Sequence, residues 1–135
     1  MWEGVAMRWS LEVVPVNVAD VDSAKRFYSE QVGFQLDLDQ RISEEMRIVQ
    51  LTPPGSTCSI QLRSGRSRLA GLQLVVDDVD EVQRELARRG VEVTEVLHFE
   101  DGVQKPGRGG DWNSFVFFAD PDGNSWVVQE RPAEH

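Results

Sequence analysis

The feature that most restricts the possible folds of this chain is an internal repeat. The segment VADVDSAKRFYSEQVGFQL at 18–36 resembles VDDVDEVQRELARRGVEV at 76–93. In each copy a strand-like run reaches an aspartate, and a helical pattern follows it. Asp20 and Asp78 are the predicted N-caps, because a carboxylate accepts the free amide hydrogens of a first helical turn. The chain is therefore expected to fold as two similar modules.

Each helical pattern ends at a glycine, Gly33 or Gly90, where a left-handed residue commonly closes a helix. Helical spacing places one apolar face on the first helix, made of Val21, Ala24, Phe27 and Tyr28. Strand-like runs follow each glycine: FQLDLD, MRIVQL and CSIQL, then VEVTEVLHF, SFVFF and SWVVQE. Each half is thus predicted to be a βαβββ unit. The fold class is α+β, with two paired βαβββ modules forming a cup-shaped mixed sheet.

The same patterns give the predicted domain organisation. Residues 1–9 are expected to be an N-terminal extension, and residues 10–131 to form a single domain. Within it, the modules are expected at 10–65 and 70–131.

On these motifs, and on FFADPDGNSWVVQE near the end, the chain resembles the vicinal oxygen chelate superfamily over about residues 10–131. That group includes glyoxalase I, bleomycin-resistance proteins, fosfomycin-resistance enzymes and extradiol dioxygenases. The resemblance implies the glyoxalase/bleomycin resistance-like fold and a homodimer. It says little about activity, because one fold supports unrelated chemistries.

Successive side chains of a strand point to opposite faces of a sheet, so each strand can be divided into a helix side and a cup side. In four strands the even-numbered residues are apolar and are assigned to the helix side: Val14, Val16, Val18, Cys58, Ile60, Leu62, Leu72, Leu74, Val76, Trp126 and Val128. The cup side then supplies the predicted ligand-binding residues Gln61, Gln73, Gln129, Ser59, Val13 and Val127. An unpaired buried amide costs roughly 1–3 kcal/mol, so the glutamines either pair with each other or with water, or bind a ligand.

The resemblance also implies where a metal would be held. Metal-dependent relatives carry ligands at inward positions of the first strand of each module and of the last strand, and glyoxalase I adds one on a fourth strand. By motif spacing those positions here are Val13, Gly71, Val127 and Gln61. Divalent ions prefer several oxygens, imidazoles or thiolates, which valine and glycine do not offer. We therefore expect no metal and no cofactor.

His98, in EVLHFEDG, is the candidate catalytic residue if the protein is an enzyme. It stands near the end of a strand expected to border the cup, where Glu100 and Asp101 can raise its pKa. The alternative is a histidine that anchors a loop.

The segment HFEDGVQKPGRGGDWNSF at 98–115 is predicted to be the least regular part of the chain. In one interpretation it covers the cup, with Trp112 stacked on a planar ligand and Arg108 bound to an anionic group. In the other it forms a dimer contact or a flap. The basic cluster RSGRSRLAG at 63–71 is interpreted as a solvated loop, with an anion site as the alternative.

Composition excludes several classes of function. A net charge of −9 argues against nucleic acid as a partner, and no apolar run reaches the roughly 20 residues of a membrane span. With the single Cys58 and no signal-like start, the expected location is cytoplasmic.

Three functional hypotheses remain. In the first, the chain binds a small organic molecule in a neutral cup without a metal, as bleomycin-resistance proteins do. In the second, it is a metal-independent lyase or isomerase of the glyoxalase type. In the third, it is a noncatalytic dimeric interaction module.

Overall fold

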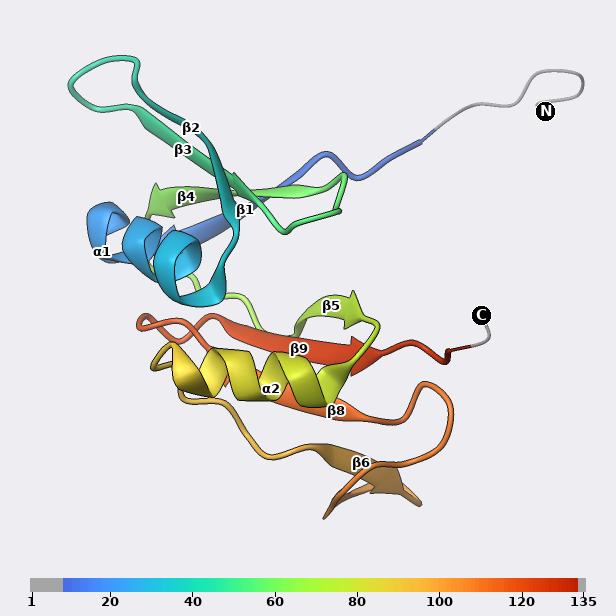
Figure 1. Ribbon diagram of the computed structural model, residues 1–135. Helices are drawn as coiled ribbons and strands as arrows, with labels where there is room; N and C mark the ends of the chain where they lie inside the picture. Colours follow the sequence, from blue (N-terminus) through green and yellow to red (C-terminus); the bar gives the residue numbers. More distant parts are fainter. Residues whose placement is uncertain (1–8, 134–135) are drawn as a thin grey trace, which may run out of the picture.

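The computed structural model describes residues 9–133. Most of the predicted extension at 1–9 lies outside that range. The elements of the first module are β1 (Val13–Val18), α1 (Val21–Arg26), η1 (Phe27–Val32), β2 (Gln35–Arg41), β3 (Arg47–Thr52) and β4 (Ser59–Ser64). Their strands form a four-stranded sheet in the order β1-β4-β3-β2, in which β1 and β4 are parallel and the other pairs antiparallel (Figure 1).

The elements of the second module are β5 (Leu72–Val76), α2 (Val79–Arg88), β6 (Leu97–Glu100), β7 (Val103–Pro106), β8 (Phe115–Ala119) and β9 (Ser125–Glu130). The sheet has five strands in the order β5-β9-β8-β6-β7. The predicted α+β fold of two related modules is confirmed, with one strand more in the second module than the repeat predicts. Within residues 9–133, no helix has the length and apolar character needed to cross a membrane.

The extra strand corrects the prediction that 98–115 is irregular. Glu100 pairs with Val103, so Asp101 and Gly102 form a two-residue loop between β6 and β7. Both loop residues have positive φ, 51° and 78°, as tight hairpin turns of the primed types require. The hairpin projects from the sheet because β6 meets β8 at one pair, Leu97 with Phe115.

The helix ends agree with the sequence. The Asp20 carboxylate accepts hydrogen bonds from the amides of Asp22 and Ser23, and Asp78 caps α2 through the amide of Glu81. The first helix continues past α1 as the wider π-helical η1 and ends at Gly33, whose φ is 90°.

The division of the strands into two sides is also confirmed for the helix side. Val16 and Val18 of β1 are buried, as are Ile60 and Leu62 of β4 and Trp126 and Val128 of β9. Val14 is half-buried, and Leu72, Leu74 and Val76 pack against the same core. We call this helix-packed side of each sheet the covered face and the opposite side the uncovered face.

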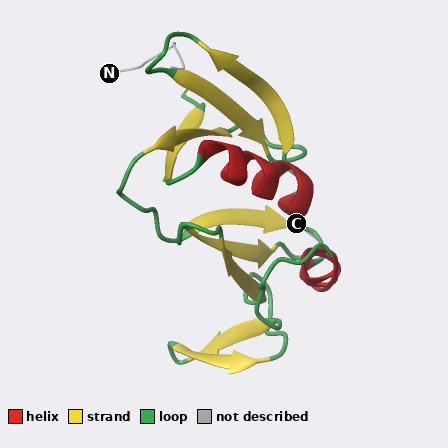
Figure 2. Cartoon of the chain, turned by 90° about the vertical axis from the view of Figure 1, so that its left-hand side faces the viewer, coloured by secondary structure: helices red, strands yellow, loops and turns green. Residues whose placement is uncertain are grey.

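The two modules join through their covered faces. Figure 2 shows the helix formed by α1 and η1 between the two sheets, with α2 at the side of the second sheet. The Tyr28 and Trp126 rings lie 5.9 Å apart, and Phe34 meets Trp126 edge-on at 5.7 Å. Because the covered face of the first sheet looks toward the second module, its uncovered face points away from that module. Within one chain both uncovered faces are therefore open.

A buried hydrogen-bond network fixes this junction. The Tyr28 hydroxyl donates to Asp120 at 2.6 Å and accepts a hydrogen bond from the Trp126 indole at 3.0 Å. Asn124 donates to Asp120 and to the Asn17 carbonyl of β1. Burial, together with the bond to Asp120, raises the pKa of Tyr28 far above its usual value, so the hydroxyl stays protonated. The turn at 120–124 thus binds the last strand to the first module.

We expect Tyr28→Phe to lower the free energy of unfolding by about 1–3 kcal/mol, because the buried Trp126 indole and Asp120 each lose a partner. Urea denaturation of both proteins measures this difference. The control is Ser29→Ala, which removes a hydroxyl bonded to the Lys25 carbonyl within the same helix. Equal losses in the two variants would contradict a special role for the Tyr28 hydroxyl.

Candidate ligand-binding surface

An aromatic wall covers part of the uncovered face of the second sheet. It consists of Phe99, Phe115 and Phe117. The Phe99 and Phe115 rings lie 5.4 Å apart edge to face, and Phe115 stacks on Phe117 at 6.2 Å. Phe99 is 37% exposed, and the other two rings are half-buried. Large apolar area that remains accessible on a sheet face is a common feature of ligand sites.

Alternation along β8 produces this wall. Val116 and Phe118 enter the core, so Phe115 and Phe117 must point to the uncovered face. Asn113 fixes the third ring, because its side chain accepts from the Phe99 amide and donates to the Phe99 carbonyl, both at 2.9 Å. The sequence prediction missed all three phenylalanines. The signal was present in the strand-like run SFVFF. If its alternate residues had been assigned to two faces, as those of SWVVQE were, Phe115 and Phe117 would have been placed on the cup side.

Gln73 and Gln129, both predicted to bind ligand, form a chain of hydrogen bonds beside the wall. Gln73 donates to the Gln129 side chain at 2.6 Å, and Gln129 donates to the Trp112 carbonyl at 2.8 Å. Trp112 has a φ of 61°, which is strained for a bulky residue, and it is 38% exposed. Two of the three predicted glutamines are thus paired with each other, and together they hold the backbone of Trp112. Val127, predicted on the same side, lies on β9 between β5 and β8.

The other predicted cup residues, Gln61, Ser59 and Val13, lie on the first sheet. Gln61 donates to Gln50 across the β3–β4 ladder at 3.0 Å. The buried Ser59 hydroxyl lies 2.6 Å from that of Thr52. The structure therefore does not bring Gln61 together with Gln73 and Gln129 in one chain. Two separate uncovered faces carry them.

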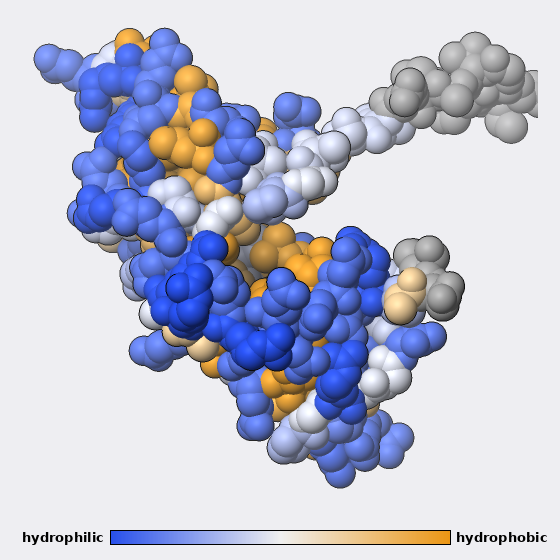
Figure 3. Space-filling view, in the orientation of Figure 1, coloured by the Kyte–Doolittle hydropathy of each residue, from blue (hydrophilic) through white to orange (hydrophobic). Residues whose placement is uncertain are grey.

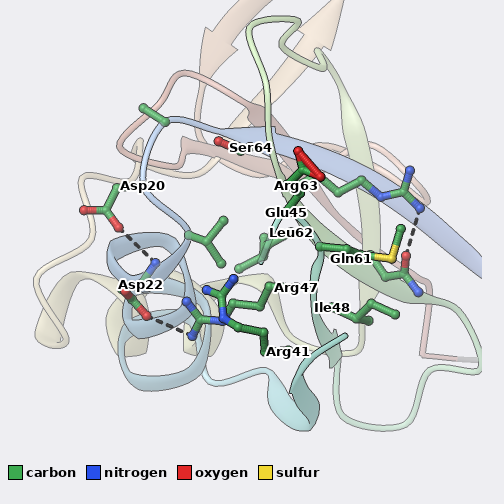
Figure 4. A pocket seen from close by; sticks show the side chains of 13 residues that line it. Asp20, Asp22, Arg41, Glu45, Arg47, Ile48, Gln61, Leu62, Arg63 and Ser64 are labelled. Atoms are coloured by element: carbon green, nitrogen blue, oxygen red, sulfur yellow. Dashed lines mark hydrogen bonds and ion pairs between the residues drawn. The ribbon is translucent and has the colours of Figure 1, made fainter. Parts of the chain in front are cut away.

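A cleft of about 710 Å³ opens at one end of the first sheet (Figure 4). Gln61 and Arg63 of β4, Ile48 of β3 and the start of α1 line it. Arg41, at the end of β2, and Met46, in the turn between β2 and β3, also line it.

Arg108 is engaged in ion pairs. Its guanidinium lies 2.6 Å from Asp80 and also contacts Glu130, and these contacts raise the pKa of Arg108. Asp78, Asp80 and Glu130 form a group of three carboxylates close enough to hold a cation, and the Arg108 charge lies against two of them. We interpret Arg108 as an anchor that ties the loop before Trp112 to α2 and β9.

His98 lies on the side of β6 opposite Leu97 and Phe99. One ring nitrogen is 2.6 Å from Glu100 and the other 2.9 Å from the Gly107 carbonyl. The Glu100 carboxylate, followed by the Gly107 carbonyl, raises the pKa of His98 above its usual value. Since both ring nitrogens are engaged, this geometry favours the anchoring interpretation over the catalytic one.

The four positions that the resemblance assigns to metal ligands are divided between the modules. Val13 and Gln61 belong to the first sheet, Val127 belongs to the second, and Gly71 directly precedes β5. Gln61 is the one side chain among them with donor atoms, and it is engaged with Gln50 and Arg63. These residues do not fit a divalent ion.

The fold and the open faces define a class of protein made of two βαβββ-like modules with ligand-accessible sheet surfaces. A family model described as the Glyoxalase/Bleomycin resistance protein/Dioxygenase superfamily matches residues 10–128. The chain belongs to this superfamily, which confirms the resemblance inferred from its motifs.

Two solved structures from Streptomyces sp. CB03234 are similar over almost the whole chain. The antibiotic binding protein TnmS3 is 32% identical with a TM-score of 0.74, covering 94% of this chain and 100% of TnmS3. A glyoxalase/bleomycin resistance protein is 33% identical with a TM-score of 0.70, covering 89% and 99%. The uncharacterized protein YetH of Bacillus subtilis is 24% identical over 123 residues, covering 87% of this chain and 94% of YetH.

The raised pKa of His98 predicts a pH-dependent stability. A protonated His98 stabilises the folded hairpin fully below its unfolded pKa of about 6.5, and this contribution disappears as the pH rises through the higher folded-state pKa. We therefore expect the difference in Tm between the wild type and His98→Gln to be largest in mild acid and to shrink toward alkaline pH. Thermal unfolding across that range measures it. A difference that is constant or grows with pH would contradict the ion pair.

Proposed function

We propose that this protein binds a small aromatic organic molecule, without a metal, and that it acts as a binding protein and not as an enzyme. The observation that carries the proposal is the aromatic wall of Phe99, Phe115 and Phe117 on an open sheet face. Aromatic side chains bind planar ligands through large apolar area and favourable ring geometry. Hydrogen bonds between the Asn113 side chain and the Phe99 backbone hold this part of the wall in place, so little entropy is lost when a ligand binds.

The comparisons support the same class of function. TnmS3, at 32% identity over nearly the full length of both chains, is an antibiotic binding protein. This similarity supports a small organic molecule as the ligand of this chain, and the aromatic wall favours an aromatic one. A lyase or isomerase would need a positioned acid or base, and the engaged ring of His98 gives that alternative no specific support.

We further propose that two copies of the chain complete the ligand chamber. Exposed hydrophobic side chains occur on both projecting hairpins and their strands: Leu36, Leu38, Ile42, Met46 and Phe99. Figure 3 shows hydrophobic residues at the surface over β2 and β3 and near β5, where a notch separates the modules. A two-fold axis would place the uncovered first sheet of one copy against the uncovered second sheet of the other, forming two equivalent chambers.

To test ligand binding, the uncharged fluorescent probe N-phenyl-1-naphthylamine is titrated into the wild type and into Phe99→Ala. We expect saturable binding that weakens about tenfold in the variant, because part of the aromatic contact is lost. The control is Val103→Ala, on the same hairpin but on the opposite face, which should bind as the wild type does. Absence of saturable binding to the wild type, or equal effects of both substitutions, would refute the proposal.

To test the second copy, light scattering is measured on the wild type and on Leu38→Asp. We expect twice the mass of a single chain for the wild type and the monomer mass for the variant, because a buried unpaired carboxylate disfavours association. Ala87→Asp, on the exposed side of α2, is the control and should remain dimeric. A monomeric wild type at high protein concentration would show that one chain binds on its own.

A further inference from the structure

Arg63 stands out among the cations of the chain. It lies on the uncovered face of β4, two residues beyond Gln61, and one guanidinium nitrogen donates to the Gln61 side-chain oxygen at 3.0 Å. Gln61 in turn donates to Gln50 at 3.0 Å. Gln61 therefore accepts from Arg63 through its oxygen and donates to Gln50 through its nitrogen. The relay fixes the orientation of Arg63 while using only one edge of its guanidinium.

The charge of Arg63 is not matched by the protein. Among residues 9–133, no carboxylate lies within ion-pair distance of it, although the sequence carries 23 acidic residues against 14 lysines and arginines. By contrast, the neighbouring Arg47 contacts Asp39 and Asp22, each at 2.9 Å, and these contacts raise the pKa of Arg47. A guanidinium with free donors is the preferred group for binding a planar anion.

Arg63 also lines the 710 Å³ cleft, together with Arg41, Arg47 and three carboxylates. Arg41, a second lining arginine, donates to the carbonyls of Ser43 and Glu44 and forms no ion pair within the described residues. Two of the lining carboxylates are used inside the protein, since Asp20 caps α1 and Asp22 pairs with Arg47. Glu45 is the third, on the turn between β2 and β3.

Apolar side chains complete the cleft. Ile48 lines it together with the two arginines (Figure 4), and Met46 is a further lining residue. A cleft with an apolar wall and an oriented cation suits a ligand that has both an aromatic body and a negative group.

We infer that the Arg63 cleft is an anion subsite, which binds a carboxylate, sulfonate or phosphate group carried by an aromatic ligand. The inference rests on the proposed function, because the anion is a substituent of the molecule held by the aromatic wall. Arg63 supplies the charge-assisted hydrogen bonds, Gln61 orients Arg63, and Arg41 adds positive potential at the rim. The ligand class is therefore an aromatic acid.

Two probes with one aromatic framework separate this inference from the proposed function. 1-Anilinonaphthalene-8-sulfonate carries a sulfonate, and N-phenyl-1-naphthylamine does not. We expect Arg63→Gln to weaken binding of the sulfonate probe by about tenfold, the usual effect of losing a charged hydrogen-bond donor, while binding of the uncharged probe stays within about twofold. Arg66→Gln removes a nearby exposed charge outside the cleft and should change neither affinity.

Two further variants sharpen the test. Arg63→Lys keeps the charge but loses the planar pair of donors, so its affinity for the sulfonate probe should fall between those of the wild type and Arg63→Gln. Glu45→Gln removes the remaining carboxylate of the cleft and should tighten binding of the same probe. Added NaCl should weaken binding of the sulfonate probe more than that of the uncharged one.

The outcomes distinguish the two proposals. If neither probe binds the wild type, the proposed function is wrong, and the anion subsite with it. If the uncharged probe binds but Arg63→Gln leaves the sulfonate probe unaffected, only the anion subsite is overturned. An equal loss of both probes in Arg63→Gln, with an unchanged Tm, would show that Arg63 contacts the aromatic body and not the anion.

Discussion

The arrangement of the whole molecule depends on one buried carboxylate. Asp120 is 4% exposed and accepts hydrogen bonds from the Tyr28 hydroxyl, the Asn124 side chain and the amides of Asp122 and Asn124. A buried charge of this kind is tolerated only when its oxygens are saturated. Saturation requires the turn at 120–124 and the first helix to be in place together, and Trp126 adds a bond to the same hydroxyl. The network therefore specifies which face of each module meets the other.

Joining the modules through their covered faces separates stability from recognition. Within β8, Val116 and Phe118 belong to the core, while Phe115 and Phe117 are directed to the open face one residue away. Substitutions on the open face therefore alter the exposed surface without opening a cavity in the core. Two solved structures at 32% and 33% identity share this fold.

The sequence predicted whatever depends on local chemistry or on strand alternation. Asp20 and Gly33 mark a helix because a cap and a left-handed turn are local requirements, and Trp126 could be assigned to the core by parity. Those signals do not show which separate elements lie next to each other in the folded chain. Gln61 was expected beside Gln129, yet parity cannot say whether two uncovered faces belong to one chamber.

The hairpin at Asp101 was missed because short polar strands have little hydrophobic periodicity, although its Asp-Gly pair is a recognised turn signal. Arg108 was expected to bind an anionic group, because the sequence does not reveal its ion pair with Asp80, 28 positions away in the chain.

The placement of recognition chemistry on different modules has a consequence for assembly. The aromatic wall around Phe115 belongs to the second sheet and Arg63 to the first, and within one chain these faces are directed apart. A ligand that touches both must bridge two copies. In the proposed dimer, such a ligand would bind more tightly than in the monomer. By thermodynamic linkage, it would stabilise the dimer by the same free energy that dimerisation adds to ligand binding. An aromatic acid would then be bound by the protein and would also hold the two copies together. An uncharged aromatic molecule that touches only the aromatic wall would bind without promoting dimerisation.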